Sequence, residues 1–264
     1  MKIGIFDSGI GGLSLLQCAM ERLPNEDFIY YADEKHVPYG EKSRREIEGF
    51  VAEIIAFLLE KKAEAVVIAC NTATSTATKA FRGRFPVPVV GMEPAVKRAL
   101  DLYGESGKRI LAAATEVTVK GEKMHRLIEE VDRERLTDLL PLPRLVRLAE
   151  AGLFDSREAE DYLRAELAPY DMGGYSSFVL GCTHFNFFKK TLRGLLPPDV
   201  RLVDGNEGTV NELCRKAARA APREKNDGDA RSVEFYISGR LACGGSRARF
   251  LSYLAWLSEM ARIN

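Results

Sequence analysis

Two stretches of the sequence share one pattern: AVVIACNT at residues 65–72 and SFVLGCTH at residues 177–184. Each is a short apolar run, typical of a buried strand, followed by a cysteine and by polar side chains that open a helix. The cysteines, Cys70 and Cys182, are 112 positions apart (182 minus 70), which suits equivalent places in two halves of one fold. The repeat therefore predicts two related halves, each carrying one cysteine.

Short apolar runs alternate with amphipathic helical patterns along almost the whole chain. In one helix, Ser43 and Glu46 have the spacing of a capping box, and apolar residues between Ile47 and Leu58 then fall on one face. This alternation predicts βαβ units and so an α/β fold of mostly parallel sheets covered by helices. We expect breaks between units near residues 92–95 and 204–208. The predicted strands are residues 2–6, 28–31, 65–69, 87–91, 109–113, 137–140, 177–180, 201–203 and 233–237.

Composition narrows the class of protein. The 264 residues are 46% hydrophobic and 29% charged, and 38 basic residues balance 38 acidic ones. A balanced charge argues against a nucleic-acid partner, which would require a basic stripe. We expect no signal peptide and no membrane span, because no apolar run approaches the roughly 20 residues that a span requires. The five scattered cysteines do not form a disulfide framework, so a cytoplasmic location is expected.

Both sequence repeats place their cysteine where parallel α/β sheets bind ligands, at the carboxyl end of a strand. A helix N-terminus favours ionised sulfur and also attracts carboxylates. Asn71, Thr72, Thr183 and His184 add side-chain donors at the same positions. Two thiolates facing one anionic substrate would repel, so one sulfur is expected as thiol while the other is thiolate. Racemisation needs that pairing, since a base removes the α-proton while an acid protonates the opposite face.

Other roles for the cysteines and glycines are weaker. Free cysteines are usually buried small residues, and we expect this of Cys18, Cys214 and Cys243. Zinc binding is disfavoured because neither C-x-x-C nor H-x-x-x-H spacing occurs. A redox pair remains open but lacks a vicinal motif. The glycines at positions 9–12 do not form the G-x-G-x-x-G pattern, so a dinucleotide site is not expected.

Five motifs in this order resemble the aspartate/glutamate racemase family over at least residues 2–206. They are FDSGIGGLS at 6–14, PYG at 38–40, ACNT at 69–72, ATEVT at 114–118 and GCTH at 181–184. The resemblance implies two pseudo-symmetric α/β domains, residues 1–94 with 207–264 and residues 95–206, with the active site in the cleft between them. It implies a homodimer that binds a small-molecule substrate and works without a cofactor or metal.

The same resemblance implies that the chain interconverts L- and D-glutamate and supplies D-glutamate for peptidoglycan. Cys70 would act on the D-enantiomer and Cys182 on the L-enantiomer, assisted by Asp7 and His184 respectively. Asp33 and Glu150 are further polar members of the expected site. The substrate-binding set is Asp7, Ser8, Tyr39, Gly40, Cys70, Asn71, Thr72, Thr115, Thr118, Thr183 and His184. An aspartate racemase, another isomerase of the superfamily, and a non-catalytic glutamate-binding protein are the alternatives.

Overall fold

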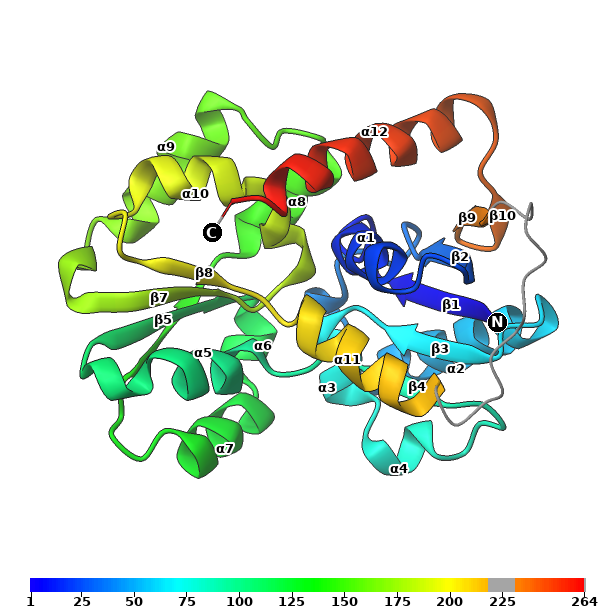
Figure 1. Ribbon diagram of the computed structural model, residues 1–264, viewed down its shortest axis with the longest axis horizontal. Coiled ribbons are helices and arrows are strands. Elements are labelled where there is room, and N and C mark those ends of the chain that lie inside the picture. The colour runs from blue at the N-terminus through cyan, green and yellow to red at the C-terminus, as the bar shows by residue number, and fades with distance from the viewer. Residues whose placement is uncertain (218–230, 264) are drawn as a thin grey trace. The chain divides into compact units, whose positions relative to one another are not determined.

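A computed structural model describes residues 1–217 and 231–263, and the chain divides into two units (Figure 1). Unit 1 contains residues 1–93 and the chain from Asn206 to Ala255, and unit 2 contains residues 94–205 and the chain from Trp256 onward. Within the described residues, the sheet of unit 1 has six strands in the order β10-β9-β2-β1-β3-β4, and that of unit 2 has four in the order β6-β5-β7-β8.

Unit 1 alternates strands and helices from its first residues. Its elements are β1 (Lys2–Asp7), α1 (Leu13–Arg22), β2 (Asp27–Ala32), η1 (Tyr39–Glu41), α2 (Arg44–Glu60), β3 (Ala65–Ile68), α3 (Asn71–Thr76), α4 (Lys79–Arg82), β4 (Val89–Gly91), α11 (Asn206–Ala217), β9 (Val233–Ile237), β10 (Arg240–Leu241) and α12 (Gly244–Met260), whose last residues belong to unit 2.

Unit 2 follows the same alternation. Its elements are α5 (Ala95–Tyr103), η2 (Gly104–Ser106), β5 (Arg109–Ala114), α6 (Glu116–Lys120), α7 (Glu122–Val131), β6 (Thr137–Pro141), α8 (Pro143–Glu150), α9 (Arg157–Leu167), η3 (Met172–Gly174), β7 (Tyr175–Leu180), η4 (Thr183–Phe188), α10 (Lys189–Leu195) and β8 (Arg201–Val203).

The predicted fold class is confirmed. Each strand expected from the sequence overlaps an observed one, and the neighbouring strands of both sheets pair in parallel, apart from the antiparallel pair β9 and β10. The two-residue strand β10 was missed, because so short a segment carries no periodicity. None of the helices in residues 1–217 and 231–263 combines the length and apolar character needed to cross a bilayer.

Adjacent residues of a strand point to opposite faces of the sheet, so the apolar strands of unit 1 present apolar side chains on both faces. Helices cover both of these faces. On one face, the apolar stripe of α2 packs against Phe6, Ile29 and Val66. On the other, α1 and α11 surround Ile5 and Val67. Full burial of an aliphatic or aromatic side chain contributes about 1.5–3 kcal/mol. The sheet is therefore held by apolar burial on both faces, which explains its continuous apolar strands.

The sheet of unit 2 is built in the same way. Helix α5 buries Ala95, Val96 and Ala99 against β5 and β7, with α7 packed beside it. Figure 1 shows α9 and α10 on the other side of this sheet. The residues from Trp256 onward, which the resemblance assigned to the first domain, pack in unit 2. There the indole of Trp256 donates to the carbonyl of Phe187 at 2.9 Å.

Parallel pairing brings the carboxyl ends of neighbouring strands to one edge of each sheet. In unit 1, Asp7 pairs with Ala32 and Phe6 with Ile68, so the segments that follow β1, β2 and β3 leave the sheet side by side. In unit 2, Ala113 pairs with Leu180, so those following β5 and β7 do the same. These two edges carry the polar motifs of the sequence.

The capping box predicted at Ser43 forms. The Ser43 hydroxyl accepts from the backbone N–H of Glu46 at 3.3 Å, and the Glu46 carboxylate accepts from the Ser43 N–H at 2.8 Å. We expect Ser43→Ala to lower the free energy of unfolding by about 1 kcal/mol, because the first turn of α2 loses an acceptor. Urea unfolding measures the change. Ser43→Thr keeps the acceptor and serves as control; equal loss in both variants would contradict this role.

Candidate active site

The end of β1 holds a fully buried carboxylate. Asp7 accepts from the Ser8 hydroxyl at 3.1 Å and faces the backbone N–H of Gly9 at 3.4 Å. The chain then turns back so closely that a Cβ atom on Gly12 would lie 2.8 Å from the Cβ atoms of both Asp7 and Ala69. A glycine is needed there because the loop packs directly on the ends of β1 and β3.

Cys70 lies two residues beyond β3 and is the N-cap of α3. Its side chain is 6% exposed, and its sulfur accepts from the backbone N–H of Ala73 at 3.4 Å. An N–H donor at a helix start stabilises negative charge on sulfur. Asn71 and Thr72 are the first residues of α3, with Thr72 buried and Asn71 partly exposed. The predicted motif is therefore placed at the carboxyl edge of the sheet.

Asp33 and Tyr39 form a second polar group at this edge. Asp33 is buried, and its carboxylate accepts from the hydroxyl of Tyr39 at 2.6 Å. Burial of Tyr39, its hydrogen bond to Asp33 and the charges of Asp33, Cys70 and Asp7 raise the pKa of its phenol well above the usual value. Tyr39 is thus a neutral phenol close to the carboxylates of Asp7 and Asp33. We call the polar residues at this sheet edge the half-site of unit 1, and those at the corresponding edge of the other sheet the half-site of unit 2. Gly40 follows it in η1.

Unit 2 brings Cys182, His184 and Glu150 into one chain of contacts. Cys182 is 7% exposed, and its sulfur lies 3.7 Å from Nδ1 of His184. Nε2 of the same ring lies 2.6 Å from Oε1 of Glu150, at the end of α8. A Cβ atom on Gly181 would lie 2.6 Å from the carbonyl oxygen of Ala113, so a glycine is needed before the cysteine.

The charge state of His184 follows from this chain. Burial alone lowers the pKa of an imidazole, because the imidazolium loses its hydration. The hydrogen bonds of His184 to Cys182 and Glu150, with the negative charges of both, outweigh burial and raise its pKa well above the usual value. The contacts therefore favour a protonated His184 between Cys182 and Glu150.

Three threonines surround the same edge of unit 2. Thr115 follows β5 and caps α6, with its hydroxyl 2.9 Å from that of Thr118 and 3.4 Å from the Thr118 N–H. Thr183 is buried, and its carbonyl accepts from the side-chain amide of Asn186 at 3.2 Å. The structure thus collects the predicted residues into one set in each unit. Unit 1 holds Asp7, Ser8, Asp33, Tyr39, Gly40, Cys70, Asn71 and Thr72, and unit 2 holds Thr115, Thr118, Glu150, Cys182, Thr183 and His184.

Comparison with known proteins identifies the family. The family model described as Asp/Glu/Hydantoin racemase matches residues 13–213. The chain is 50% identical over 268 residues to the glutamate racemase of Campylobacter curvus (strain 525.92), covering 100% of each. The chain belongs to the Asp/Glu/Hydantoin racemase family.

Solved members of this racemase family share the fold. Escherichia coli glutamate racemase, in complex with L-glutamate and the activator UDP-MurNAc-ala, matches with a TM-score of 0.82 at 32% identity, over 97% of this chain and 94% of that one. The enzyme of Francisella tularensis subsp. tularensis SCHU S4, in complex with D-glutamate, matches with a TM-score of 0.78 at 26% identity, over 96% of this chain and 93% of that one. The racemase class expected from the sequence is confirmed.

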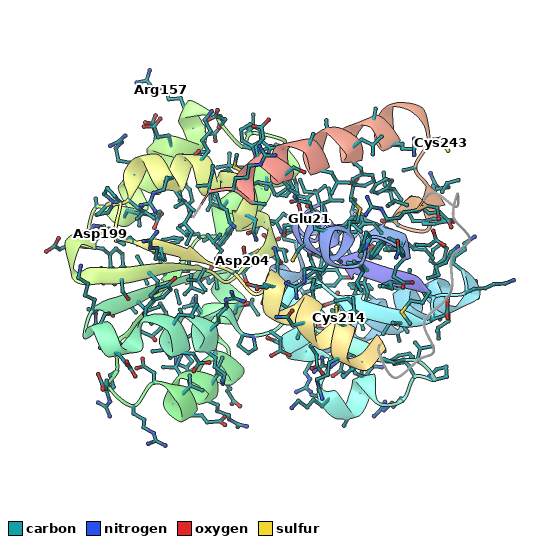
Figure 2. All side chains as sticks on the ribbon, viewed as in Figure 1. Glu21, Arg157, Asp199, Asp204, Cys214 and Cys243 are labelled. Carbon is teal, nitrogen blue, oxygen red and sulfur yellow. The ribbon has the colours of Figure 1, made fainter. Side chains whose placement is uncertain are left out.

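The remaining cysteines differ from the two of the racemase motifs. Cys18 on α1 is partly exposed. Cys214 on α11 is also partly exposed, and Cys243, just before α12, is exposed (both labelled in Figure 2). The expectation of a buried position is therefore wrong for all three. Cys243 departs most from it, because it lies in a polar turn where its N–H donates to the Ser246 hydroxyl at 3.1 Å. In the part of the chain that the structure describes, no group of three or more His, Cys, Asp or Glu side chains is arranged to hold a metal.

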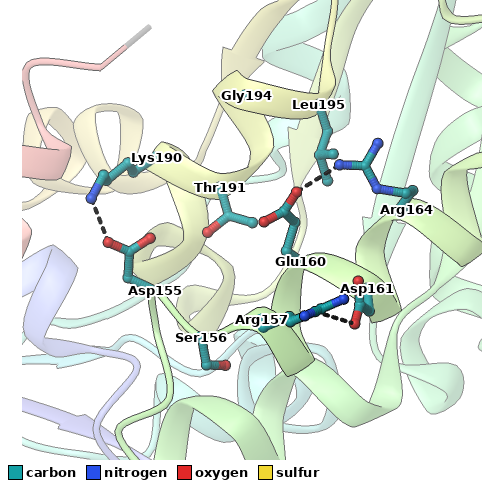
Figure 3. A pocket seen from close by; sticks show the side chains of 10 residues that line it. All are labelled: Asp155, Ser156, Arg157, Glu160, Asp161, Arg164, Lys190, Thr191, Gly194 and Leu195. Carbon is teal, nitrogen blue, oxygen red and sulfur yellow. Dashed lines mark hydrogen bonds and ion pairs between the residues drawn. The ribbon is translucent and has the colours of Figure 1, made fainter.

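A cavity of about 610 Å³ between α9 and α10 in unit 2 is separate from the racemase motifs, since none of its lining residues belongs to them. Three ion pairs occupy its rim, Lys190 with Asp155, Arg164 with Glu160, and Arg157 with Asp161 (Figure 3). Their side chains are mostly in solvent, where such pairs contribute about 0–1 kcal/mol. The charges satisfy one another, so we assign the cavity no role in the reaction.

Two residues that hold the polar groups at the sheet edge of unit 1, Tyr30 and His36, were not among those predicted from the sequence. The hydroxyl of Tyr30, a buried residue of β2, donates to the carbonyl of Gly9 at 2.7 Å and so fixes the loop after Asp7. His36 lies 2.8 Å from the carboxylate of Asp33. The three-residue separation of Asp33 and His36 was the available signal for the second contact. For Tyr30 the sequence offers no signal, because a buried strand tyrosine looks like any core residue.

The contacts of His184 with Cys182 and Glu150 predict at which pH His184 loses its proton. We expect His184 to remain protonated well above pH 6.5, the ordinary value for histidine. NMR titration of the three histidines, assigned by His36→Gln and His125→Gln, measures this directly. Because the pKa of His184 is raised in the folded state, its contacts with Cys182 and Glu150 stabilise the fold. This stabilisation is complete below the unfolded-state pKa of about 6.5 and is lost as the pH rises through the folded-state pKa.

Glu150→Gln tests the cause of the raised pKa. Loss of the carboxylate charge should move the His184 titration to lower pH, whereas Glu105→Gln, an exposed change in the same unit, should leave it in place. A His184 signal that titrates at the same pH in both variants would show that Glu150 does not hold the proton.

Proposed function

We propose that the chain interconverts L- and D-glutamate by a two-base mechanism without a cofactor, with Cys70 and Cys182 as the two acid/base residues. The contact chain of Cys182, His184 and Glu150 carries the proposal, because it prepares one sulfur to accept a proton. The equivalent position of Cys70, at the carboxyl edge of the other sheet, supplies the second acid/base group. The relatives that act on glutamate support the choice of substrate.

The reaction of L-glutamate begins at Cys182. Its thiolate takes the α-proton and becomes a thiol, while the protonated His184 keeps the sulfur negative until the proton arrives. The thiol of Cys70 then protonates the opposite face of the α-carbon and becomes a thiolate, which gives D-glutamate. The reverse reaction begins with Cys70 as thiolate and exchanges the roles. This chemistry requires the two sulfurs to lie on opposite faces of one substrate α-carbon.

The half-site of unit 1 stabilises a thiolate by different groups. The N–H of Ala73 donates to the sulfur of Cys70, and the start of α3 adds its partial positive charge. Asp7, buried at the end of the neighbouring strand β1, is the carboxylate that assists Cys70 in the proposal. Its charge also suits the ammonium group of an amino acid. The unit therefore offers one donor set for sulfur and one acceptor set for the substrate.

Donors at the two sheet edges would hold the substrate carboxylates. We assign this role to the side chains of Ser8, Asn71, Thr72, Thr115, Thr118 and Thr183 and to the backbone at Tyr39 and Gly40. Carboxylate binding by N–H and hydroxyl groups also stabilises the charge that develops when the α-proton leaves. Such stabilisation is required because the mechanism has no pyridoxal phosphate to accept the electrons.

We also propose a cellular role and an assembly for the chain. D-glutamate made in the cytoplasm would supply peptidoglycan synthesis, and a homodimer is the expected assembly. Light scattering of the purified chain tests the assembly directly, since its monomer mass is 29.3 kDa.

Deuterium incorporation at Cα tests the proposed reaction. In heavy water, the unaltered chain should exchange the α-proton of both enantiomers of glutamate. Cys70→Ser and Cys182→Ser should each lower racemisation by about 10²- to 10⁴-fold, because a serine hydroxyl is a far weaker acid than a thiol and does not ionise near neutral pH to act as the base. Cys243→Ser, at the exposed cysteine just before α12, is the matched control and should retain full activity.

The pattern of the losses separates the alternatives. Wild-type rates in both active-site variants would eliminate the two-cysteine mechanism. Faster turnover of D-aspartate than of D-glutamate would identify an aspartate racemase. Glutamate binding without any exchange at Cα would identify a non-catalytic binding protein.

A further inference from the structure

The segment after β2 contains a buried carboxylate with several donors. Asp33 accepts from the hydroxyl of Tyr39 at 2.6 Å, from Nδ1 of His36 at 2.8 Å and from the hydroxyl of Ser238 at 3.4 Å. An ionised carboxylate has no hydrogen to donate, so Nδ1 of His36 carries the hydrogen in this contact. The side chain of His36 is 26% exposed, whereas that of Asp33 is 3% exposed. The imidazole therefore connects a buried acceptor with solvent.

The ring of His36 is held in one orientation. It stacks on Phe50 of α2 with ring centroids 3.9 Å apart and an angle of 9° between the planes. Its own backbone N–H donates to the carbonyl of Asp33 at 3.1 Å. Stacking and the backbone bond together aim Nδ1 at the carboxylate. A side chain so restrained loses little additional entropy in keeping this hydrogen bond.

We propose that His36 is a positioning residue for the racemase reaction, acting through Asp33 to fix the hydroxyl of Tyr39 as a hydrogen-bond acceptor toward the substrate. The inference rests on the proposed function, because it assigns Tyr39 to the substrate site. No motif of the sequence includes His36, and its contact with Asp33 is what assigns it.

The hydroxyl hydrogen of Tyr39 points at Asp33. A phenol has a single hydrogen, and Tyr39 gives it to Asp33, so the rest of its oxygen can act solely as an acceptor. If Asp33 lost its donor from His36, a buried carboxylate would be left with less compensation for its charge. The carboxylate would then keep only its contacts with the hydroxyls of Tyr39 and Ser238 to fix its rotation, and the Tyr39 hydroxyl would be held less firmly in one direction. His36 restricts that movement.

An acceptor at Tyr39 fits the chemistry of the substrate. The chain segments η1 and α3 are in contact, which places Tyr39 beside the helix that begins after Cys70. The α-ammonium of an amino acid is a strong donor, and a neutral phenol oxygen can accept from it without adding another negative charge near the Cys70 sulfur. A hydrogen directed at the ammonium would instead repel it. His36 therefore acts on substrate binding and orientation.

Two substitutions at position 36 separate hydrogen bonding from stacking. His36→Asn keeps an N–H donor at the place of Nδ1 and should retain kcat/KM for Cα exchange within about twofold. His36→Phe keeps the stacking on Phe50 but has no donor, and should lower kcat/KM about tenfold, mainly through a higher KM. His125→Phe on the exposed face of α7 is the control and should change nothing. If His36→Phe fails to fold, His36→Gln, whose amide extends past the Nδ1 position, replaces it.

A double-mutant cycle decides whether the effect passes through Tyr39. In a Tyr39→Phe background, His36→Phe should cause no further loss, because the hydroxyl that it orients is absent. Full additivity of the two losses, or an equal loss in His36→Asn and His36→Phe, would overturn the proposal. If the unaltered chain exchanged no proton at all, the proposed function would fail instead. The same series, read as D-glutamate affinity by calorimetry, would then test the role of His36 by itself.

Discussion

Parallel strand register is the constraint on which the site depends. Because β1 pairs with both β2 and β3, the residues after these strands leave one edge of the sheet together. Asp7, Asp33 and Cys70 are far apart in the chain, and register alone makes them neighbours at that edge. In unit 2, the pairing of β5 with β7 does the same for Thr115 and Cys182. Helices packed on both sheet faces hold this register, since a slip of one residue would exchange the side chains that pack against the two helical layers.

The sequence was sufficient for features that follow from local pattern. Buried parallel strands are continuous apolar runs, and the capping box at Ser43 and Glu46 is a local signal, so both were predictable. The contact of Cys182 with His184 was also predictable, because two residues at the start of one segment stay close whatever the rest of the fold does. These features need no knowledge of distant residues.

Contacts across the chain were not accessible in the same way. Glu150 reaches His184 from the end of α8, and a surface glutamate would have the same sequence context. Tyr30 and Trp256 each donate to a backbone carbonyl, and a carbonyl leaves no trace in the sequence. The position of Trp256 in unit 2 depends on this hydrogen bond and on packing with Phe154, at 6.0 Å between ring centroids. Such details require the packed structure, because they are decided by tertiary contacts rather than by propensity.

The two half-sites hold their sulfurs by different physics, and this asymmetry bears on the reaction. Cys182 has a partner that can carry a full positive charge, His184, backed by the carboxylate of Glu150. Cys70 has a backbone N–H and a helix start, with Asp7 and the neutral Tyr39 nearby. In the proposed two-base mechanism each sulfur must be able to hold and to release a proton, since both directions of the reaction use both groups. Opposite protonation states then have to be of similar free energy. The surroundings of the two sulfurs therefore need not be identical. At Cys70 the start of α3 and the buried Asp7 would set this free energy, and at Cys182 the pair of His184 and Glu150 would do so.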